Sequence, residues 1–283
     1  MTGCSTGIGR AVASRLARGG YAVVATARRV EDLRDLVADG DRGAGGLSVA
    51  RLDVTDEVSV RECVAEVEAR HGAVWGLVNN AGYALPGPLE DIPLDEARHQ
   101  FEVNVLGPLL VAQAVLPGMR AAGEGRIVNV SSVAGRFSLP GGGCYHASKH
   151  ALTSLSATLG LETRSFGVRV STIEPAAVRT AFIETALNVL SRGGRRLPVY
   201  DAYRKRLETF YGRVRSRPRR YGVGSAQAVA RAVEHALTSR GPRSRYVVGP
   251  AARLSLGLHG LLPGPWFDAL ACAVFPVPRP EGE

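Results

Sequence analysis

At 283 residues, with 45% hydrophobic and 22% charged residues, the chain can bury a full core as one large domain. It has no apolar run near the roughly 18 residues of a membrane span, no signal peptide before its first motif and four cysteines without metal-type spacing. These features argue against an integral membrane protein and predict a cytoplasmic protein with reduced thiols. The net charge of +9 falls within the stretch from Arg192 to Arg220 rather than on the fold itself, so we expect no nucleic-acid partner.

The chain opens with a glycine-rich loop, "TGCSTGIG", followed by a helical pattern. Gly3, Gly7 and Gly9 have the spacing at which backbone N–H groups at a helix N-terminus face a dinucleotide pyrophosphate. A buried strand normally delivers such a loop, but only Met1 precedes it. We therefore expect the first strand to be missing from the N-terminus because the start is assigned several codons too late. Its neighbours would then stand about 9 to 10 Å apart.

Short apolar, β-branched stretches alternate with longer helical patterns along the rest of the chain. Strands are expected at 21–26, 47–52, 74–78, 126–130, 168–173 and 245–248. Helices are expected near 31–38, 56–70, 95–121, 145–165 and 225–239. Repeated βα units with nearly continuous apolar strands predict a mostly parallel sheet covered on both faces, which is the doubly wound Rossmann fold. No repeat or linker divides it, so we expect a single domain over 1–248.

Two segments depart from this alternation. Residues 185–222 form an Arg-rich insertion, in which eleven Arg or Lys residues from Arg192 to Arg220 face only two acids. We interpret it as a solvated helix or one that faces an anionic ligand. The extension at 249–283 is rich in Leu, Pro and Gly and contains Trp266 and Phe267. It could cap a pocket or touch a membrane surface, but we expect it to pack on the body or on a second subunit of a homo-oligomer.

Four polar residues are candidates for catalysis. In "YHASK", Tyr145 and Lys149 lie at i, i+4 on one helix face. A phenol of pKa near 10 transfers protons poorly at neutral pH unless a cation favours the phenolate, and Lys149 is such a cation. Ser132 ends the strand "RIVNVSS", which places its hydroxyl at the carboxyl edge of the sheet, where open α/β folds bind ligands. Asn104 lies in an apolar helical stretch, where a helix kink or cap explains it as well as chemistry does.

The motifs occur together in the order and spacing of a known family. "TGCSTGIG", "LDVTD", "NNAG", "NVLG", "VNVSS", "YHASK" and "EPAAVRT" resemble the short-chain dehydrogenase/reductase family from residue 2 to about 180, and loosely to 248. The sequence is most similar to bacterial relatives of the 17β-hydroxysteroid and retinol dehydrogenases, because of "TGCSTGIG" and "VVATARR". The match covers most of the chain, so the expected fold and the expected family agree.

The resemblance implies a role for each catalytic candidate. Tyr145 would be the general acid when a carbonyl is reduced and the general base when an alcohol is oxidised, and Ser132 would hold the substrate oxygen. Lys149 would lower the pKa of Tyr145 and bind the nicotinamide ribose. Asn104 would anchor a water in the proton relay. Hydride moves from the cofactor itself, so the task of the protein is placement.

The cofactor is expected to be NADP(H). NAD enzymes typically carry Asp or Glu at the end of the second strand, whereas Ala27 is followed here by Arg28 and Arg29. Arg28 would pair with the 2′-phosphate, although both arginines could also be solvated loop residues. Ala176 stands where the family usually has Gly after Pro, which narrows the allowed backbone there. The implied cofactor-binding residues are Gly3, Ser5, Gly7, Ile8, Gly9, Arg28, Asp53, Asn80, Ala81, Gly82, Tyr145, Lys149, Pro175, Val178 and Thr180.

The expected function is oxidation or reduction of a lipophilic alcohol, ketone or aldehyde, such as a steroid-, retinoid- or polyketide-like molecule. The residues expected to line the pocket are apolar: Ala84 to Pro86, Phe137, Leu139, Pro140, Phe182, Ile183 and Leu187. A reductase of 3-oxoacyl groups on an acidic carrier protein is the alternative. A non-catalytic nucleotide sensor is disfavoured because all four catalytic positions are filled. His146 and His150 share one helix without an acidic ligand between them, so we expect no metal.

Overall fold

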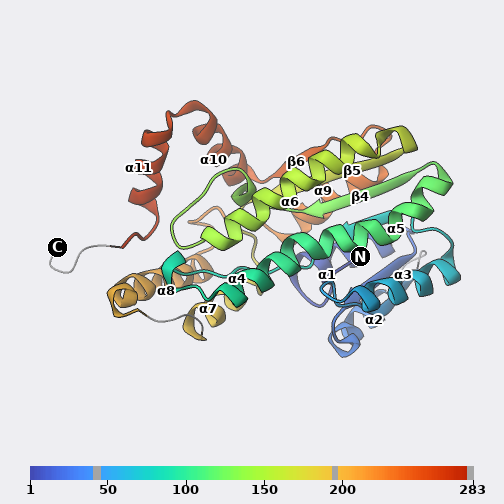
Figure 1. The fold of residues 1–283 in the computed structure, drawn as a ribbon, viewed down its shortest axis with the longest axis horizontal. Coiled ribbons are helices and arrows are strands. Elements are labelled where there is room, and N and C mark those ends of the chain that lie inside the picture. The colour runs from blue at the N-terminus through green and yellow to red at the C-terminus, as the bar shows by residue number, and fades with distance from the viewer. Residues whose placement is uncertain (41–45, 193–196, 279–283) are drawn as a thin grey trace.

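The computed structural model describes residues 1–40, 46–192 and 197–278. In these residues six parallel strands form the centre of the fold and helices cover both faces (Figure 1). The strands are β1 (Val23–Ala27), β2 (Leu47–Arg51), β3 (Gly76–Asn79), β4 (Gly125–Val130), β5 (Val168–Pro175) and β6 (Arg245–Val248). β1 pairs with β2, and β3 to β6 pair in sequence order. The predicted doubly wound Rossmann fold is confirmed.

Two layers of helices sandwich the strands. The helices are α1 (Gly7–Arg18), α2 (Arg34–Gly40), α3 (Glu57–His71), α4 (Leu94–Phe101), α5 (Gly107–Ala122), α6 (Gly143–Glu162), α7 (Phe182–Arg192), α8 (Asp201–Ser216), α9 (Ala226–Thr238), α10 (Pro250–Leu261) and α11 (Gly264–Val274). Val12 of α1 and Val233 of α9 share an apolar cluster with Val78 of β3. Val115 of α5 clusters instead with Leu77, the residue before Val78. Consecutive strand residues therefore face opposite layers, which is why these strands read as continuous apolar runs.

Met1 to Cys4 lie between β1 and β3, near the carboxyl ends of these strands. Thr26 N donates to Met1 O (2.9 Å) and Cys4 N donates to Thr26 O (3.0 Å) on one side, while Thr2 N donates to Val78 O (3.0 Å) on the other. Cys4 is fully buried. Met1 and the first residues of the glycine loop therefore lie between the first and third expected strands, as predicted. These four residues join the two sheets.

The helix expected over 95–121 runs through α4, a π-helical turn at Glu102–Leu106 and α5. By length and composition, Leu94–Ala122 is the one helix of the described residues that could cross a membrane, with a mean hydropathy of 1.4 in its most apolar part. The expectation that no segment suits a membrane was therefore too strict. The criterion is also met by core helices of globular proteins, and here α5 packs on β3 and β4.

The Arg-rich insertion forms α7 and α8, except for residues 193–196, which lie outside the described part of the chain. On α8 the side chains of Arg213 and Arg215 are exposed, whereas Tyr203 and Leu207 are buried. Only the outer side of α8 therefore fits the solvated helix that the sequence suggested. In Figure 1, α7 and α8 lie at the same end of the molecule as α10 and α11.

The C-terminal helices α10 and α11 pack on the segment that follows β4. Ala252 of α10 and Phe267 of α11 share a cluster with Val133 and Phe137, and the rings of Phe137 and Phe267 lie 5.3 Å apart. Trp266 remains exposed. Packing on the rest of the domain is one of the arrangements expected for this extension. It brings α11 into contact with Phe137, in the segment that follows Ser132.

Candidate active site

The four predicted catalytic side chains meet at the carboxyl edge of the sheet. Ser132 follows β4, Tyr145 and Lys149 lie in the first two turns of α6, and Asn104 lies in the π-helical turn before α5. Ser132 lies close enough to Tyr145 for its hydroxyl to favour ionisation of the phenol. Lys149 Nζ lies 5.8 Å from the centroid of the Tyr145 ring. Asn104 Nδ2 donates to Ser148 Oγ (3.0 Å), which donates to the backbone carbonyl oxygen of Tyr145 (2.7 Å), so the π-helical turn is tied to the backbone of α6 at Tyr145.

Ser132 is held between the ends of two strands. Its Oγ accepts a hydrogen bond from Ala134 N (3.1 Å) and donates one to Pro175 O at the end of β5 (3.2 Å). The preceding residue is held too, because Ser131 N donates to Ile173 O (2.9 Å). Parallel strands end at the same edge of a sheet, so this hydroxyl lies where open α/β folds bind their ligands.

Burial governs the ionisation of Tyr145 and Lys149. Protein atoms crowded around the phenol raise the pKa of Tyr145 to about 12, although the hydroxyl of Ser132 acts in the lowering direction. Burial also lowers the pKa of Lys149 to about 8, while its Nζ donates to Val130 O (3.0 Å). The pKa of Tyr145 is thus raised overall, because desolvation outweighs the lowering effect of Ser132. The lowering of this pKa by Lys149 stays a prediction.

Asn104 is both a helix irregularity and a clamp. It is fully buried in the π-helical turn at Glu102–Leu106, so the kink that the sequence left open is present. Its Oδ1 accepts from Tyr83 N (3.1 Å), and its Nδ2 donates to Tyr83 O (3.0 Å) as well as to Ser148. Short π-helical turns are frequent at functional sites. The side-chain amide therefore ties the segment after β3 to the catalytic helix, and anchoring of a water stays a prediction.

The glycine loop leaves no room for larger side chains. Gly3 and Gly7 have φ of 67° and 59°, in the left-handed region that favours glycine. A β-carbon on Gly9 would lie 2.1 Å from Gly3 O, and one on Gly7 would lie 3.0 Å from the side chain of Thr180. The Thr6 side chain makes no capping hydrogen bond to α1, so the N–H groups of the first turn suit a phosphate. The cradle fits the pyrophosphate of a dinucleotide.

The segment after β3 forms the second side of this cradle. Asn80 Nδ2 donates to Gly3 O (2.8 Å) and to Thr2 O (3.1 Å), which fixes the glycine loop. A β-carbon on Gly82 would lie 3.1 Å from Asn104 Oδ1 and 3.6 Å from Lys149 Nζ. The other predicted residues of this edge are partly buried beside them: Ser5, Ile8 and Ala81. The glycine loop and "NNAG" thus lie side by side, and Gly82 brings this segment next to Lys149.

The segments after β1 and β2 carry Arg28 and Asp53, which the sequence predicts to bind the cofactor. Arg28 follows β1 and is exposed, while Arg29 Nη2 pairs with Asp32 Oδ1 at 2.8 Å. Asp53 Oδ1 accepts hydrogen bonds from Thr55 N (3.0 Å) and Thr55 Oγ1 (2.8 Å). Burial acts to raise the pKa of Asp53, but the bonds from Thr55 and the charges of Arg28 and Arg51 hold it below its ordinary value. The charge of Arg28 therefore acts on Asp53, and binding of the adenosine half of a cofactor by the two residues stays a prediction.

The loop after β5 is held by pairing with the segment before α9. Arg179 N donates to Gly224 O (3.0 Å), and Gly224 N donates to Ala177 O (2.8 Å), so Val178 forms an isolated β-bridge there. Thr180 Oγ1 accepts from Phe182 N (3.2 Å). Ala176 packs against the apolar cluster of Val133 and Phe137. The loop that would meet the nicotinamide is thus held by backbone pairing with the segment before α9. Alanine at position 176 does not prevent this pairing.

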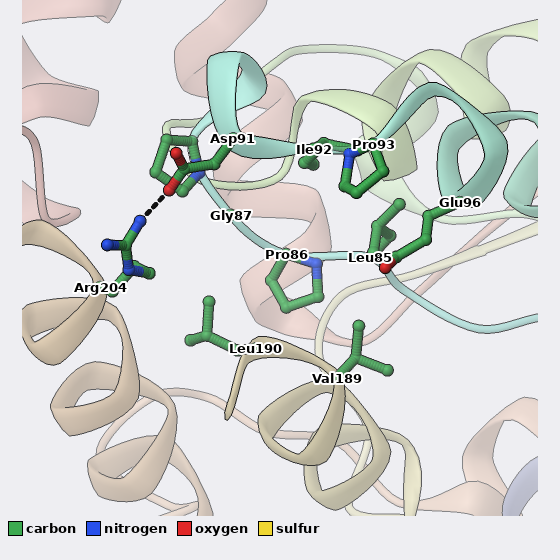
Figure 2. Close-up of a pocket in the computed structure, with 11 residues that line it drawn as sticks. Leu85, Pro86, Gly87, Asp91, Ile92, Pro93, Glu96, Val189, Leu190 and Arg204 are labelled. Carbon is green, nitrogen blue, oxygen red and sulfur yellow. Dashed lines mark hydrogen bonds and ion pairs between the residues drawn. The ribbon is translucent and has the colours of Figure 1, made fainter. Parts of the chain in front are cut away.

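The segment after β3 and α7 combine predicted apolar residues with a buried charge pair. The rings of Phe182 and Tyr145 lie 5.6 Å apart, so α7 begins over the catalytic phenol. Figure 2 shows a small cavity, of about 20 Å³, that Leu85 and Pro86 share with Val189 and Leu190 of α7. Asp91 and Arg204 point toward each other across one end of it. Sequence reasoning expected only apolar lining, because no local pattern links Asp91 to a basic residue on α8.

Sequence reasoning also missed Tyr211 on α8. Its phenol is close enough to Tyr145 to act against ionisation of that residue. Burial raises the pKa of Tyr211 itself to about 12. The signal was present in the sequence as Tyr203, Leu207 and Tyr211 at i, i+4 and i+8, which is one helix face. The density of arginines around this stripe hid it.

The two histidines of α6 are engaged with backbone carbonyls. His146 is buried, and its Nδ1 lies 2.7 Å from Phe137 O. His150 Nδ1 lies 2.9 Å from His146 O. Burial lowers the pKa of His146, so its ring is neutral at physiological pH and serves as a structural tie. His146 thereby fastens the segment after Ser132 to the helix that carries Tyr145.

Comparison with known proteins agrees with this geometry. The family model described as short chain dehydrogenase matches residues 1–188. Human retinol dehydrogenase 5 is 34% identical over 289 residues, covering 98% of this chain and 88% of that protein. A short-chain dehydrogenase from Streptomyces avermitilis has a similar structure, with a TM-score of 0.75, 35% identity and coverage of 91% of this chain and 89% of that one. An alcohol dehydrogenase from the archaeon Thermococcus sibiricus, complexed with 5-hydroxy-NADP, has a TM-score of 0.70, 27% identity and coverage of 89% and 95%.

Proposed function

The chain belongs to the short-chain dehydrogenase family, and we propose that it is an NADP(H)-dependent oxidoreductase that interconverts a ketone or aldehyde and an alcohol on a lipophilic substrate. One observation carries the proposal. The hydroxyl of Ser132 favours ionisation of the Tyr145 phenol, Lys149 lies beside that phenol, and Gly82 of the segment that holds the glycine loop lies next to Lys149. The Thermococcus relative in complex with 5-hydroxy-NADP and the human relative named retinol dehydrogenase support the cofactor and the substrate class. The free thiols, Cys4 and Cys63 among them, support a reducing cytosol.

The chemistry assigned to the chain is proton transfer and placement. When bound, the nicotinamide supplies or accepts the hydride. Ser132 holds the substrate oxygen through its hydroxyl, and Tyr145, protonated at neutral pH because burial raises its pKa, gives its proton to that oxygen in reduction. Protonated Lys149 stabilises the phenolate that remains and would bind the nicotinamide ribose. Asn104 anchors a water in the proton relay. Phe182 covers the ring of Tyr145 and helps to exclude bulk water from the phenol.

A substrate panel tests the proposal. NADPH absorbance is followed with lipophilic ketones, with aldehydes and with 3-oxoacyl thioesters of an acidic carrier protein. We expect turnover of free lipophilic carbonyls. The exposed arginines of α8, such as Arg213 and Arg215, favour the carrier-bound alternative, which a much higher kcat/KM on thioesters would establish. Binding of NADPH without turnover on any carbonyl would favour a nucleotide sensor instead.

The pH dependence of reduction should report the ionisation of Lys149. Burial lowers its pKa to about 8, so the protein without substrate loses the ammonium as pH rises through that value. Tyr145 stays protonated in the same range, because its pKa is about 12. We therefore expect kcat/KM for carbonyl reduction to fall above about pH 8, since a neutral amine no longer stabilises the phenolate. A profile that stays flat to pH 10 would contradict this role of Lys149.

Replacing Arg28 by Asp should reverse the preference between the two nicotinamide cofactors. A charge-assisted contact of about 1.5 to 3 kcal/mol becomes a repulsion, so the Kd for NADPH should rise roughly tenfold or more while that for NADH changes little. Titration of both cofactors by fluorescence measures the effect. Arg29→Asp is the matched control, because Arg29 already pairs with Asp32. Equal weakening of both cofactors by Arg28→Asp would show that Arg28 does not contact the 2′-phosphate.

A further inference from the structure

Glu174 is a fully buried carboxylate next to the active site to which the mechanism gives no role. It lies at the end of β5, one residue before Pro175. Its Oε2 lies 3.3 Å from Arg136 Nη1, and its Oε1 accepts from Thr172 Oγ1 (3.3 Å) and lies 4.0 Å from Arg245 Nε. A carboxylate in this position is costly to bury unless it is paired and hydrogen-bonded. A buried carboxylate this close to Ser132 therefore suggests a role at the active site.

Three consecutive residues of β5 hold the turn that carries Ser132. Ile173 O accepts from Ser131 N (2.9 Å), Glu174 pairs with Arg136 (3.3 Å), and Pro175 O accepts from Ser132 Oγ (3.2 Å). The turn itself is a single 3-10 turn at Val133–Gly135, which ends where Arg136 begins. The two backbone contacts lie at the start of the turn, and the ion pair holds its far end. Such a short turn has few hydrogen bonds of its own, so its position depends on these outside contacts.

We propose that the ion pair of Arg136 and Glu174 positions Ser132, so that these two are positioning residues for the substrate oxygen. The inference rests on the proposed function in one respect, which is that Ser132 holds that oxygen. Fixing both ends of the turn limits the hydroxyl to the place where it also contacts Tyr145. A displacement of the hydroxyl by about 1 Å can lower the rate roughly a hundredfold.

Arg245 provides a matched control within the same cluster. It lies on β6, it also faces Glu174, and its side chain is exposed to a similar degree as that of Arg136 (44% and 36%). Removing either guanidinium takes one positive charge from the same buried carboxylate. Only Arg136 belongs to the turn of Ser132, so a positioning role predicts different effects for the two arginines, whereas a purely electrostatic or stabilising role predicts similar ones.

The test compares Arg136→Gln with Arg245→Gln in the full-length protein. We expect Arg136→Gln to lower kcat about tenfold with the Kd for NADPH unchanged within about twofold, and Arg245→Gln to leave kcat within about twofold of the parent. In a Ser132→Ala background, Arg136→Gln should lower kcat by less than about twofold further, because the group it positions is gone. A full tenfold loss in that background, or equal effects of the two arginine variants, would overturn the proposal.

Hydrogen exchange gives a readout that does not depend on turnover. The Ala134 amide donates to Ser132 Oγ, so it should exchange faster in Arg136→Gln and at the parent rate in Arg245→Gln. If Arg136→Gln fails to fold, Arg136→Lys, which keeps the charge, replaces it and should show a smaller change in the same direction. A parent protein without any carbonyl turnover would defeat the proposed function alone. Unchanged protection of Ala134 in the Arg136 variants would defeat this inference alone.

Discussion

Tyr145→Phe is expected to lower kcat roughly 10²- to 10⁴-fold, because the variant keeps the ring and loses only the proton donor. The ring packs against Phe182, with centroids 5.6 Å apart, and lies under Lys149 Nζ at 5.8 Å, and both contacts survive the change. NADPH binding should therefore stay within about twofold of the parent. Single-turnover kinetics with NADPH, together with a fluorescence titration of the cofactor, separates the chemical step from binding.

Tyr211→Phe is the matched control for this variant. It also removes one phenol hydroxyl from a partly buried tyrosine near Tyr145, but this hydroxyl is on α8 and is assigned no proton transfer. Its effect on kcat should stay below about tenfold. Turnover of Tyr145→Phe within a few-fold of the parent would remove Tyr145 from the mechanism. A comparable loss in both variants would show that the polarity of the pocket, rather than proton donation, controls the rate.

The strands and the parallel sheet were predictable because the central strands are buried on both faces. An apolar run such as the one around Leu77 and Val78 must be covered by helices on either side, and this alone indicates a parallel sheet. The ends of the strands were less well predicted. β5 runs to Pro175, two residues past the expected end at 173, because the buried Glu174 looks like a loop residue in sequence. Its partners come from elsewhere in the fold.

The catalytic positions were predictable because local spacing carries them. Tyr145 and Lys149 lie one helical turn apart, and Ser132 closely follows a strand. Short distances along the sequence are therefore enough to place these three residues. The contacts that tertiary structure creates could not be predicted in this way. Arg204 reads as one of eleven basic residues in a stretch, yet it forms a buried ion pair with Asp91, 113 residues away. No period or motif links two such positions.

The overall pKa of Tyr145 could not be predicted from the sequence for the same physical reason. The sequence shows that a lysine lies one helical turn after Tyr145, which favours the phenolate. It does not show how many protein atoms surround the hydroxyl, and these raise the pKa to about 12. Burial also lowers the pKa of Lys149 to about 8, so this lysine keeps its charge only below that pH. Charge spacing can be read from a sequence, whereas desolvation needs the packed structure.

Gly9→Ala is expected to lower kcat/KM for NADPH roughly a hundredfold, because the added β-carbon meets backbone rather than a flexible side chain. It would lie 2.1 Å from Gly3 O and 2.6 Å from Asn80 Nδ2, and Asn80 already holds Gly3 O by a hydrogen bond of 2.8 Å. Relief requires the glycine loop to move by about 1 Å, which is enough to misplace a bound pyrophosphate. Overpacking of this kind also lowers the free energy of unfolding by about 1 to 3 kcal/mol. Chemical denaturation and a cofactor titration measure the two effects.

Gly257→Ala separates the loss of the cradle from a general effect of replacing a helical glycine. Gly257 lies within α10, and a β-carbon there would meet nothing within 4 Å. Alanine at this position should leave NADPH binding unchanged and raise the free energy of unfolding by about 0.5 to 1 kcal/mol, since glycine is the poorer helix former. If Gly9→Ala binds NADPH as tightly as Gly257→Ala does, the loop of Gly3, Gly7 and Gly9 does not hold the pyrophosphate, and the cofactor assignment built on this loop is wrong.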